Sequence, residues 1–152
     1  MVLMNIINYI FGYSNNYVDD YKKQLQFVPS IKEKISDQNI SEENSLLTNI
    51  AKFVKTCNKT RFIVSLSGGV DSMVLLTILK YLKYQVIGVH INYNNRPETN
   101  LEQEFLEKWC SFNNIKLYIK NIDNIKRSNV KRSDYELITK KIRFDFYKEI
   151  MG

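Results

Sequence analysis

The stretch 62–80, FIVSLSGGVDSMVLLTILK, constrains the fold of this chain more than any other part of the sequence. Its first residues, 62–66, form a short apolar run that is typical of a buried β-strand. Apolar residues then recur at helical spacing over 73–82, after the glycine-containing segment 67–72. A strand, a tight turn and a helix in this order place backbone N–H groups around an anion at the helix N-terminus. We therefore predict a phosphate-binding loop, and hence a nucleotide site, at 67–72.

The residues of this segment, SGGVDS, suit contact with phosphate. Gly68 and Gly69 let the backbone pass close to an anion, and Ser67 and Ser72 add hydroxyl donors. The spacing matches neither GxxxxGK[ST] nor GxGxxG, which disfavours a Walker-type loop and a dinucleotide fold. An accidental Gly-Gly turn followed by a capped helix is the alternative interpretation.

A carboxylate inside the segment, Asp71, needs its own explanation because it repels phosphate. A divalent cation between the two removes this repulsion, and Mg²⁺ prefers one or two carboxylates together with phosphate oxygens. We therefore predict a magnesium ion at Asp71.

The rest of the chain alternates between helical and strand patterns. Ser41 is the predicted cap of a first helix, and the apolar runs 85–92 and 115–119 are predicted strands. Helices are predicted from about 98 to 113 and after a cap at Ser133. The apolar stripe predicted for the first helix consists of Leu46, Leu47, Ile50, Phe53 and Val54, and that of the last helix consists of Tyr135, Ile138, Ile142, Phe146 and Ile150. On the helix at 98–113, the residues predicted to be largely outward are Glu102, Glu104, Glu107 and Lys108.

This alternation predicts an α/β fold with a parallel, doubly wound sheet and right-handed crossovers. Ligands of such sheets bind beyond the carboxyl ends of the strands. The segments 67–72 and 93–97 both lie there. Residues 1–40 are predicted to be a separate N-terminal extension with short helices at 5–11 and 17–27, and the domain is predicted to span 41–152.

The charge distribution and the cysteine content indicate which partners and which cellular compartment to expect. Residues 116–152 hold ten Lys/Arg and five Asp/Glu, which accounts for +5 of the net charge of +6. This local excess indicates a polyanionic partner such as RNA, or else a solvated basic face. Cys57 and Cys110 form no CxxC pair, so we expect idle thiols in a reducing compartment. No apolar run approaches the ~20 residues of a membrane span, so we expect a cytoplasmic protein without membrane contact.

SGGVDS between a strand and a helix resembles the PP-loop of the N-type ATP pyrophosphatases, which split ATP into AMP and pyrophosphate. The resemblance implies an adenine nucleotide alpha hydrolase-like fold with ATP and Mg²⁺ as cofactors. It implies that the loop holds the pyrophosphate part of ATP through Ser67, Gly68, Gly69, Val70, Asp71 and Ser72.

Two further segments resemble the tRNA(Ile)-lysidine synthetases within that superfamily. VHINYNNRPE, at 89–98, is similar to their VHVNHGLR segment, although Tyr93 replaces a His and Asn94-Asn95 replace Gly-Leu. The helix 135–144 is similar to their ARxxRY helix, with Arg143 at the second Arg. The family continues with a fourth strand and a motif rich in His and Asp, so the domain is expected to be incomplete at its C-terminus.

The resemblance implies that ATP adenylates a cytidine carbonyl of tRNA and that free lysine then displaces AMP. His90 and Asn92 would line the adenosine side, and Asp71 and Arg143 would act in catalysis. The implied RNA contacts are Arg96, Lys126, Arg127, Lys131 and Arg132. A neutral strand histidine bonded to a neighbour is the alternative for His90, and surface ion pairs are the alternative for Arg96 and Arg143.

Three other functions remain open at this point. A tRNA thiolase of the same superfamily uses the same loop but commonly carries paired cysteines. GMP and NAD synthetases share SGGxDS but not the segment at 89–98. A non-catalytic ATP- or RNA-binding module is the third alternative, and a homo-oligomer is compatible with each of them.

Overall fold

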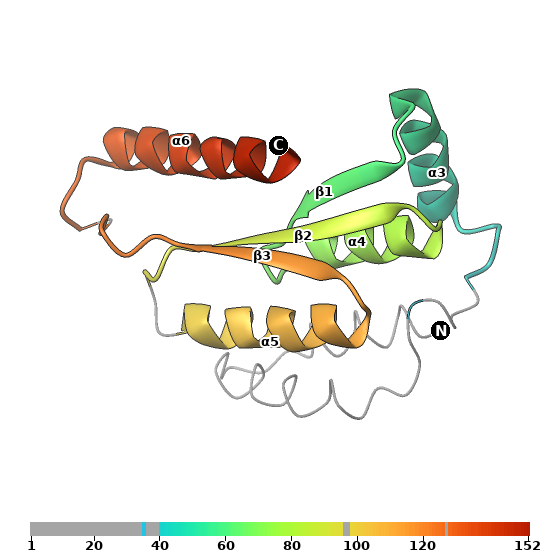
Figure 1. The fold of residues 1–152 in the computed structure, drawn as a ribbon, viewed down its shortest axis with the longest axis horizontal. Helices are drawn as coiled ribbons and strands as arrows, with labels where there is room; N and C mark the ends of the chain where they lie inside the picture. Colours follow the sequence, from blue (N-terminus) through green and yellow to red (C-terminus); the bar gives the residue numbers. More distant parts are fainter. Residues whose placement is uncertain (1–34, 36–39, 96–97, 127) are drawn as a thin grey trace.

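The computed structural model describes residue 35 and residues 40–95, 98–126 and 128–152 (Figure 1). The predicted helices at 5–11 and 17–27 lie outside the described residues. The alternation predicted from the sequence is confirmed. The elements are α3 (Ser45–Cys57), β1 (Arg61–Ser65), α4 (Val70–Tyr81), β2 (Gln85–Asn92), α5 (Glu98–Phe112), β3 (Lys116–Asn121) and α6 (Arg132–Met151).

The three strands form one parallel sheet, as predicted, and their order in it is β1-β2-β3. β1 ends at Ser65, which lies opposite Val89, whereas β2 continues for three more residues to Asn92. The last residues of β2 therefore lie beside the segment that leaves β1. This register brings 67–72 and the end of β2 together at the carboxyl edge of the sheet.

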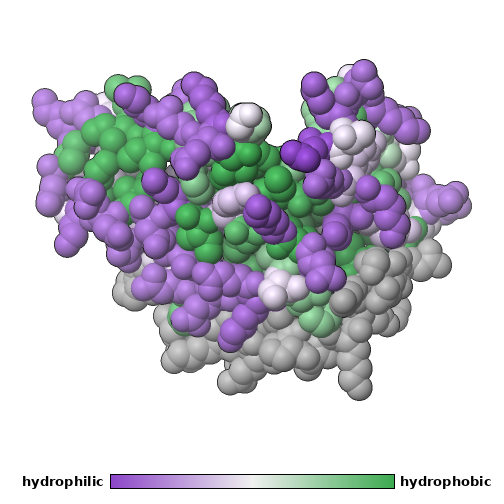
Figure 2. Space-filling model, in the orientation of Figure 1, coloured by the Kyte–Doolittle hydropathy of each residue, from purple (hydrophilic) through white to green (hydrophobic). Residues whose placement is uncertain are grey.

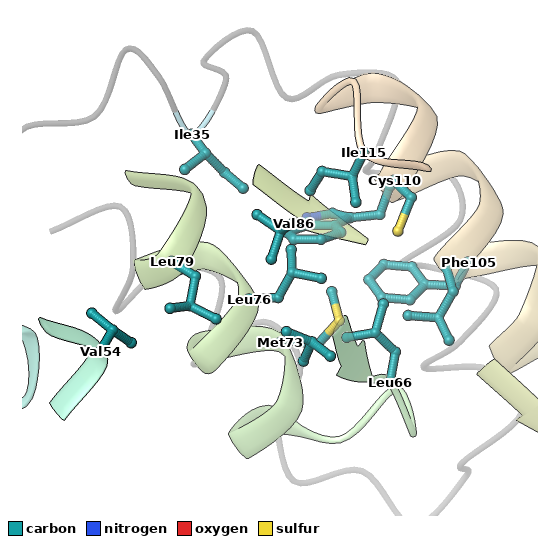
Figure 3. Packing of buried hydrophobic residues seen from close by; sticks show 13 residues of the cluster. Ile35, Val54, Leu66, Met73, Leu76, Leu79, Val86, Phe105, Cys110 and Ile115 are labelled. Atoms are coloured by element: carbon teal, nitrogen blue, oxygen red, sulfur yellow. The ribbon is translucent and has the colours of Figure 1, made fainter. Parts of the chain in front are cut away.

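Helices cover both faces of the sheet (Figure 1). Successive strand residues point to opposite faces, so Val64, Leu66 and Val86 join the core under α4 and α5, while Val89 and Ile91 join the core under α6. Figure 3 shows side chains from α4, β2 and α5 converging in the first core together with Leu66, which follows β1, while Val54 of α3 lies at its margin. Leu76 of α4 is 0% exposed there, and burying such a side chain stabilises the fold by about 1.5–3 kcal/mol.

Both predicted helix caps are wrong. The turn at 41–44 places Asn44, not Ser41, before α3, and the Asn44 Oδ1 atom accepts from the N–H groups of Leu46 (3.0 Å) and Leu47 (3.1 Å). The Ser41 hydroxyl instead accepts from the N–H of Glu43 at 3.3 Å. On α6 the cap position is Lys131, without a side-chain cap, so Ser133 lies one residue inside the helix.

The predicted helix faces are correct only in part. On α3, Leu47 and Val54 are buried, but Phe53 is 67% exposed, because only a narrow strip of the helix surface contacts the rest of the protein. On α5, Glu102 was predicted to face outward and is 4% exposed. It lies three and four residues before two buried side chains, at 105 and 106, and therefore on the same helix face.

Apolar side chains are also exposed on α6 and in the hollow between α6 and α3 (Figure 2). The large exposed side chains of α6 are Leu137, Ile138, Phe144 and Met151. None of the helices in the described part of the chain is long and apolar enough to cross a membrane.

Candidate nucleotide-binding site

The loop between β1 and α4 has the backbone geometry of an anion cradle. Gly68 has φ +83°, in the left-handed region that a residue without Cβ adopts at low cost. Gly69 is extended (φ −76°, ψ 159°) and is the N-cap residue of α4. A Cβ added at Gly69 would lie 3.2 Å from the Ser67 Oγ atom, which is too close for an ordinary contact. The loop shape therefore favours glycine at 68, whereas a side chain at 69 would require Ser67 Oγ to shift by a few tenths of an ångström.

The start of α4 has donors available for a ligand. No side chain caps the helix, and the first N–H groups of an α-helix have no partner within the helix. The helix dipole adds partial positive charge at the same point. A phosphate at the loop would receive these N–H groups directly.

The two serine hydroxyls close the loop on itself. The Ser72 hydroxyl donates to the Gly69 carbonyl at 2.9 Å and accepts from the Ser67 N–H at 3.3 Å. The Ser67 Oγ atom accepts from the Gly69 N–H at 3.2 Å and lies 3.4 Å from the Ser72 Oγ atom. Apart from the 2.9 Å hydrogen bond between Ser72 and Gly69, these contacts are long. A phosphate oxygen can therefore replace them at a low cost in free energy.

The predicted magnesium ligand is exposed at the mouth of the loop. Asp71 lies in the first turn of α4, where the helix dipole favours a carboxylate. The described residues contain no cluster of three or more His, Cys, Asp or Glu that could hold a metal. A single carboxylate fits an ion held mainly by phosphate oxygens and water, which is the usual form of protein-bound Mg²⁺.

His90 lies under the loop instead of on the surface. It is 3% exposed, and its Nδ1 atom is 2.8 Å from the carbonyl oxygen of Leu66. Because a carbonyl accepts, Nδ1 carries the proton and donates. The Nε2 atom is buried and has no hydrogen-bond partner among the residues that the structure describes. His90 therefore supports the residue that precedes the loop.

Asn92 connects β2 to its surroundings through both ends of its amide. Its Nδ2 group donates to Asn100 Oδ1 (3.2 Å) and Gln103 Oε1 (2.9 Å) of α5. Its Oδ1 atom accepts from the Asn94 N–H at 2.9 Å. Asn92 thereby fixes the turn that leaves β2.

Two hollows of about 430 Å³ each lie along the carboxyl edge, beside β2 and β3. The Asn94 amide donates to Asp123 Oδ1 at 3.1 Å and so joins the two loops that form the first hollow. Lys126 lines this hollow together with Tyr93. The second lies between the end of β3 and α6. The sequence pattern carries no signal for the pair Asn94–Asp123, which depends on the order of the strands.

The predicted RNA contacts lie on the surface where they are described. Lys126, Lys131 and Arg132 are exposed. Arg132 forms an ion pair of 2.9 Å with Glu136, and this hydrogen bond raises the pKa of Arg132. Arg143 is half-buried, with its guanidinium 5.9 Å from the Phe144 ring. Arg96 and Arg127 lie outside the described residues.

Both cysteines are free thiols, as predicted. Cys110 is buried, and burial raises its pKa to about 12. Such a thiol forms almost no thiolate and is a poor sulfur carrier.

The loop, the helix N-terminus and the parallel sheet define an α/β protein with a phosphate site of the PP-loop type. The family model of the PP-loop domain matches residues 42–152, and the chain belongs to this family. Membership implies an ATP-binding site. The resemblance identified from the loop residues is thus confirmed.

Similar proteins point in the same direction. The chain is 38% identical to the tRNA(Ile)-lysidine synthase of Mycoplasmopsis pulmonis over 86 residues, 57% of this chain and 28% of the relative. It is 36% identical to that of Mesomycoplasma hyopneumoniae over 97 residues (64% and 31%) and 32% identical to that of Clostridium perfringens over 125 residues (79% and 24%). The chain thus spans less than a third of the length of these curated relatives.

Proposed function

We propose that this chain uses ATP to modify tRNA, by adenylating a carbonyl oxygen of a base. The observation that carries this proposal is the loop at 67–72, whose left-handed Gly68 and uncapped helix start form a cradle for phosphate. The names of the relatives supply the RNA substrate. Since ATP and tRNA share the cytoplasm, we place the protein there.

The more specific proposal is the ligation of free lysine to a cytidine of isoleucine tRNA. The carbonyl oxygen attacks the α-phosphate, pyrophosphate leaves, and the amine of lysine then displaces AMP. The N–H groups at the start of α4 and the hydroxyls of Ser67 and Ser72 would stabilise the charge that develops on pyrophosphate. Magnesium, held at Asp71 and by phosphate oxygens, would share that charge. Arg143 is proposed to contact the reacting phosphate or the RNA.

No side-chain nucleophile is needed in this scheme, because the substrates supply both attacking groups. The buried Cys110, with its raised pKa, argues against sulfur transfer through that residue. A binding module without turnover is the other candidate. It would need only the phosphate cradle at 67–72.

The proposals are separated by one incubation of the chain with ATP, Mg²⁺, unmodified isoleucine tRNA transcript and labelled lysine. Lysine incorporated into RNA, together with one pyrophosphate per lysine, is the expected result. Pyrophosphate release that depends on tRNA but not on lysine would support adenylation and contradict lysine as the acceptor. ATP binding without pyrophosphate release would leave the binding module.

A further inference from the structure

The segment that leads into the phosphate loop is held by two side chains from distant parts of the chain. From β2, His90 Nδ1 donates to the Leu66 carbonyl at 2.8 Å. From α6, the Tyr147 hydroxyl donates to Ser65 Oγ at 2.7 Å, across 82 residues of sequence. The two accepting residues are the last two before Ser67. Both contacts are therefore made to the residues that lead directly into the loop.

The two contacts act from opposite faces of the sheet. Along β2, Val89 and Ile91 lie on the α6 face, so His90 lies on the other face. Along β1, Val64 and Leu66 belong to the core under α4 and α5, so Ser65 faces α6. A side chain above the sheet and one below it thus hold consecutive residues.

The hydrogen bond from His90 of β2 satisfies the second backbone polar group of Leu66. Its N–H donates to the Val89 carbonyl at 2.7 Å, and its carbonyl accepts from His90. Leu66 is 2% exposed, and a buried carbonyl without a hydrogen-bond partner destabilises the fold. The His90 imidazole therefore avoids the free-energy cost of an unpaired carbonyl immediately before the loop.

The contact from α6 is a polar link between that helix and the strand before the loop. The α6 residues around it, Ile142, Phe146 and Ile150, contact the sheet through apolar groups, and such contacts are not directional. A hydrogen bond of 2.7 Å fixes the position of Tyr147 relative to Ser65 more narrowly. Arg143 lies one turn earlier on α6, about 6 Å along the axis and on the same side of the helix.

We propose that Tyr147 and His90 are positioning residues for the phosphate loop, and that the Tyr147–Ser65 hydrogen bond ties the seating of α6 to the shape of the loop. Neither residue has to touch the nucleotide. The proposal rests on ATP binding at the loop, but its effect on loop order is measurable without ATP.

The first test is amide hydrogen exchange of the nucleotide-free chain. Tyr147→Phe and Ser65→Ala each remove one half of the pair, and the double variant removes both. We expect exchange at the hydrogen-bonded amides of Leu66, Ser67 and Gly69 to accelerate about 3- to 10-fold, as for the loss of one neutral hydrogen bond. The double variant should match either single variant, because the two changes break the same bond. Tyr84→Phe, at the amino end of β2, is the matched control and should leave these amides unchanged.

Unchanged exchange at Leu66, Ser67 and Gly69 in Tyr147→Phe would overturn the proposal. So would faster exchange spread evenly over α4, β2 and α5, because that would mark general destabilisation. Strictly additive effects in the double variant would also contradict a shared bond.

The second test uses ATP titration and a conservative variant of His90. His90→Asn keeps an N–H donor near the Nδ1 position, whereas His90→Leu removes it. We expect ATP affinity about 3- to 10-fold lower in His90→Leu and Tyr147→Phe and restored toward the parent in His90→Asn. Equal affinity in parent, Tyr147→Phe and His90→Leu would refute positioning. No ATP binding by the parent would refute the proposed function instead, and hydrogen exchange would still decide the positioning roles.

Discussion

At the scale of single residues, the close packing around Gly88, beside Leu66, leaves no room for a Cβ atom without a shift of its neighbours. A Cβ at Gly88 would lie 2.9 Å from Leu66 Cδ1 and 3.1 Å from Leu117 Cδ1. We predict that Gly88→Ala lowers the free energy of unfolding by about 1–3 kcal/mol, the usual cost of overpacking a core. Urea denaturation measures this. An unchanged midpoint would show that the space under Leu66 is larger than the structure indicates.

The two thiols should differ in reactivity. Burial raises the pKa of Cys110 to about 12, so at pH 8 only about one molecule in ten thousand carries the thiolate. Cys57 is half-buried. Alkylation at pH 8 followed by mass spectrometry should modify Cys57 first and Cys110 only after unfolding. Equal rates at both sites in the folded chain would contradict the burial of Cys110.

The sequence was informative about residues whose role is local. Gly68, Gly69 and Asp71 are neighbours in the chain, so their spacing alone predicts an anion site beside a metal. Tyr147 and Ser65 lie 82 residues apart, and their contact exists only because α6 covers the face toward which Ser65 points. Side-chain pairs of this kind follow from the tertiary arrangement and have no signature in the chain.

At the scale of secondary-structure elements, the hydrogen bonds at the start of α3 show which of two residues, Ser41 or Asn44, caps the helix. The Asn44 Oδ1 atom accepts two helix N–H groups, whereas Ser41 accepts none from α3. We predict that Asn44→Ala destabilises the chain by about 1 kcal/mol and that Ser41→Ala, its matched control, changes stability by less than about 0.5 kcal/mol. Thermal denaturation measures both. Equal losses would contradict this helix start.

Element types followed from the sequence more readily than element ends. Apolar runs predicted β1, β2 and β3, although only β2, the central strand, is buried along most of its length. The cap of α3 was wrong because Ser41, Asn44 and Ser45 are all good cap residues, and the turn at 41–44 decides among them. The charge of Glu102 predicts an exposed side chain, but the helical period places it on the buried face of α5.

At the scale of the whole molecule, the basic C-terminal quarter is proposed to bind RNA. Lys126 and Lys131 are exposed at the carboxyl edge and at the start of α6. We predict that Lys126→Ala and Lys131→Ala each lower the slope of log affinity for tRNA against log salt by about 0.7–0.9, one phosphate contact each. Filter binding at several salt concentrations measures this. Lys52→Ala, on α3, is the control, and an equal effect there would contradict a localised RNA surface.

The whole-molecule architecture was predictable in outline. Alternating strands and helices predicted a parallel sheet covered on both faces, and the carboxyl edge was the predicted location of the ligand. The order of the strands could not be read from the chain. The hollows beside β2 and β3 depend on that order, so they emerged only from the structure.

The central claim is that the loop at 67–72 binds ATP and that Asp71 holds its magnesium. Calorimetric titration of the chain with ATP, with and without Mg²⁺, tests it most directly. We predict one ATP per chain, bound more tightly with Mg²⁺, and loss of that magnesium effect in Asp71→Asn, with stability within about 1 kcal/mol of the parent. Absence of ATP binding, or a magnesium effect that survives in Asp71→Asn, would contradict the account.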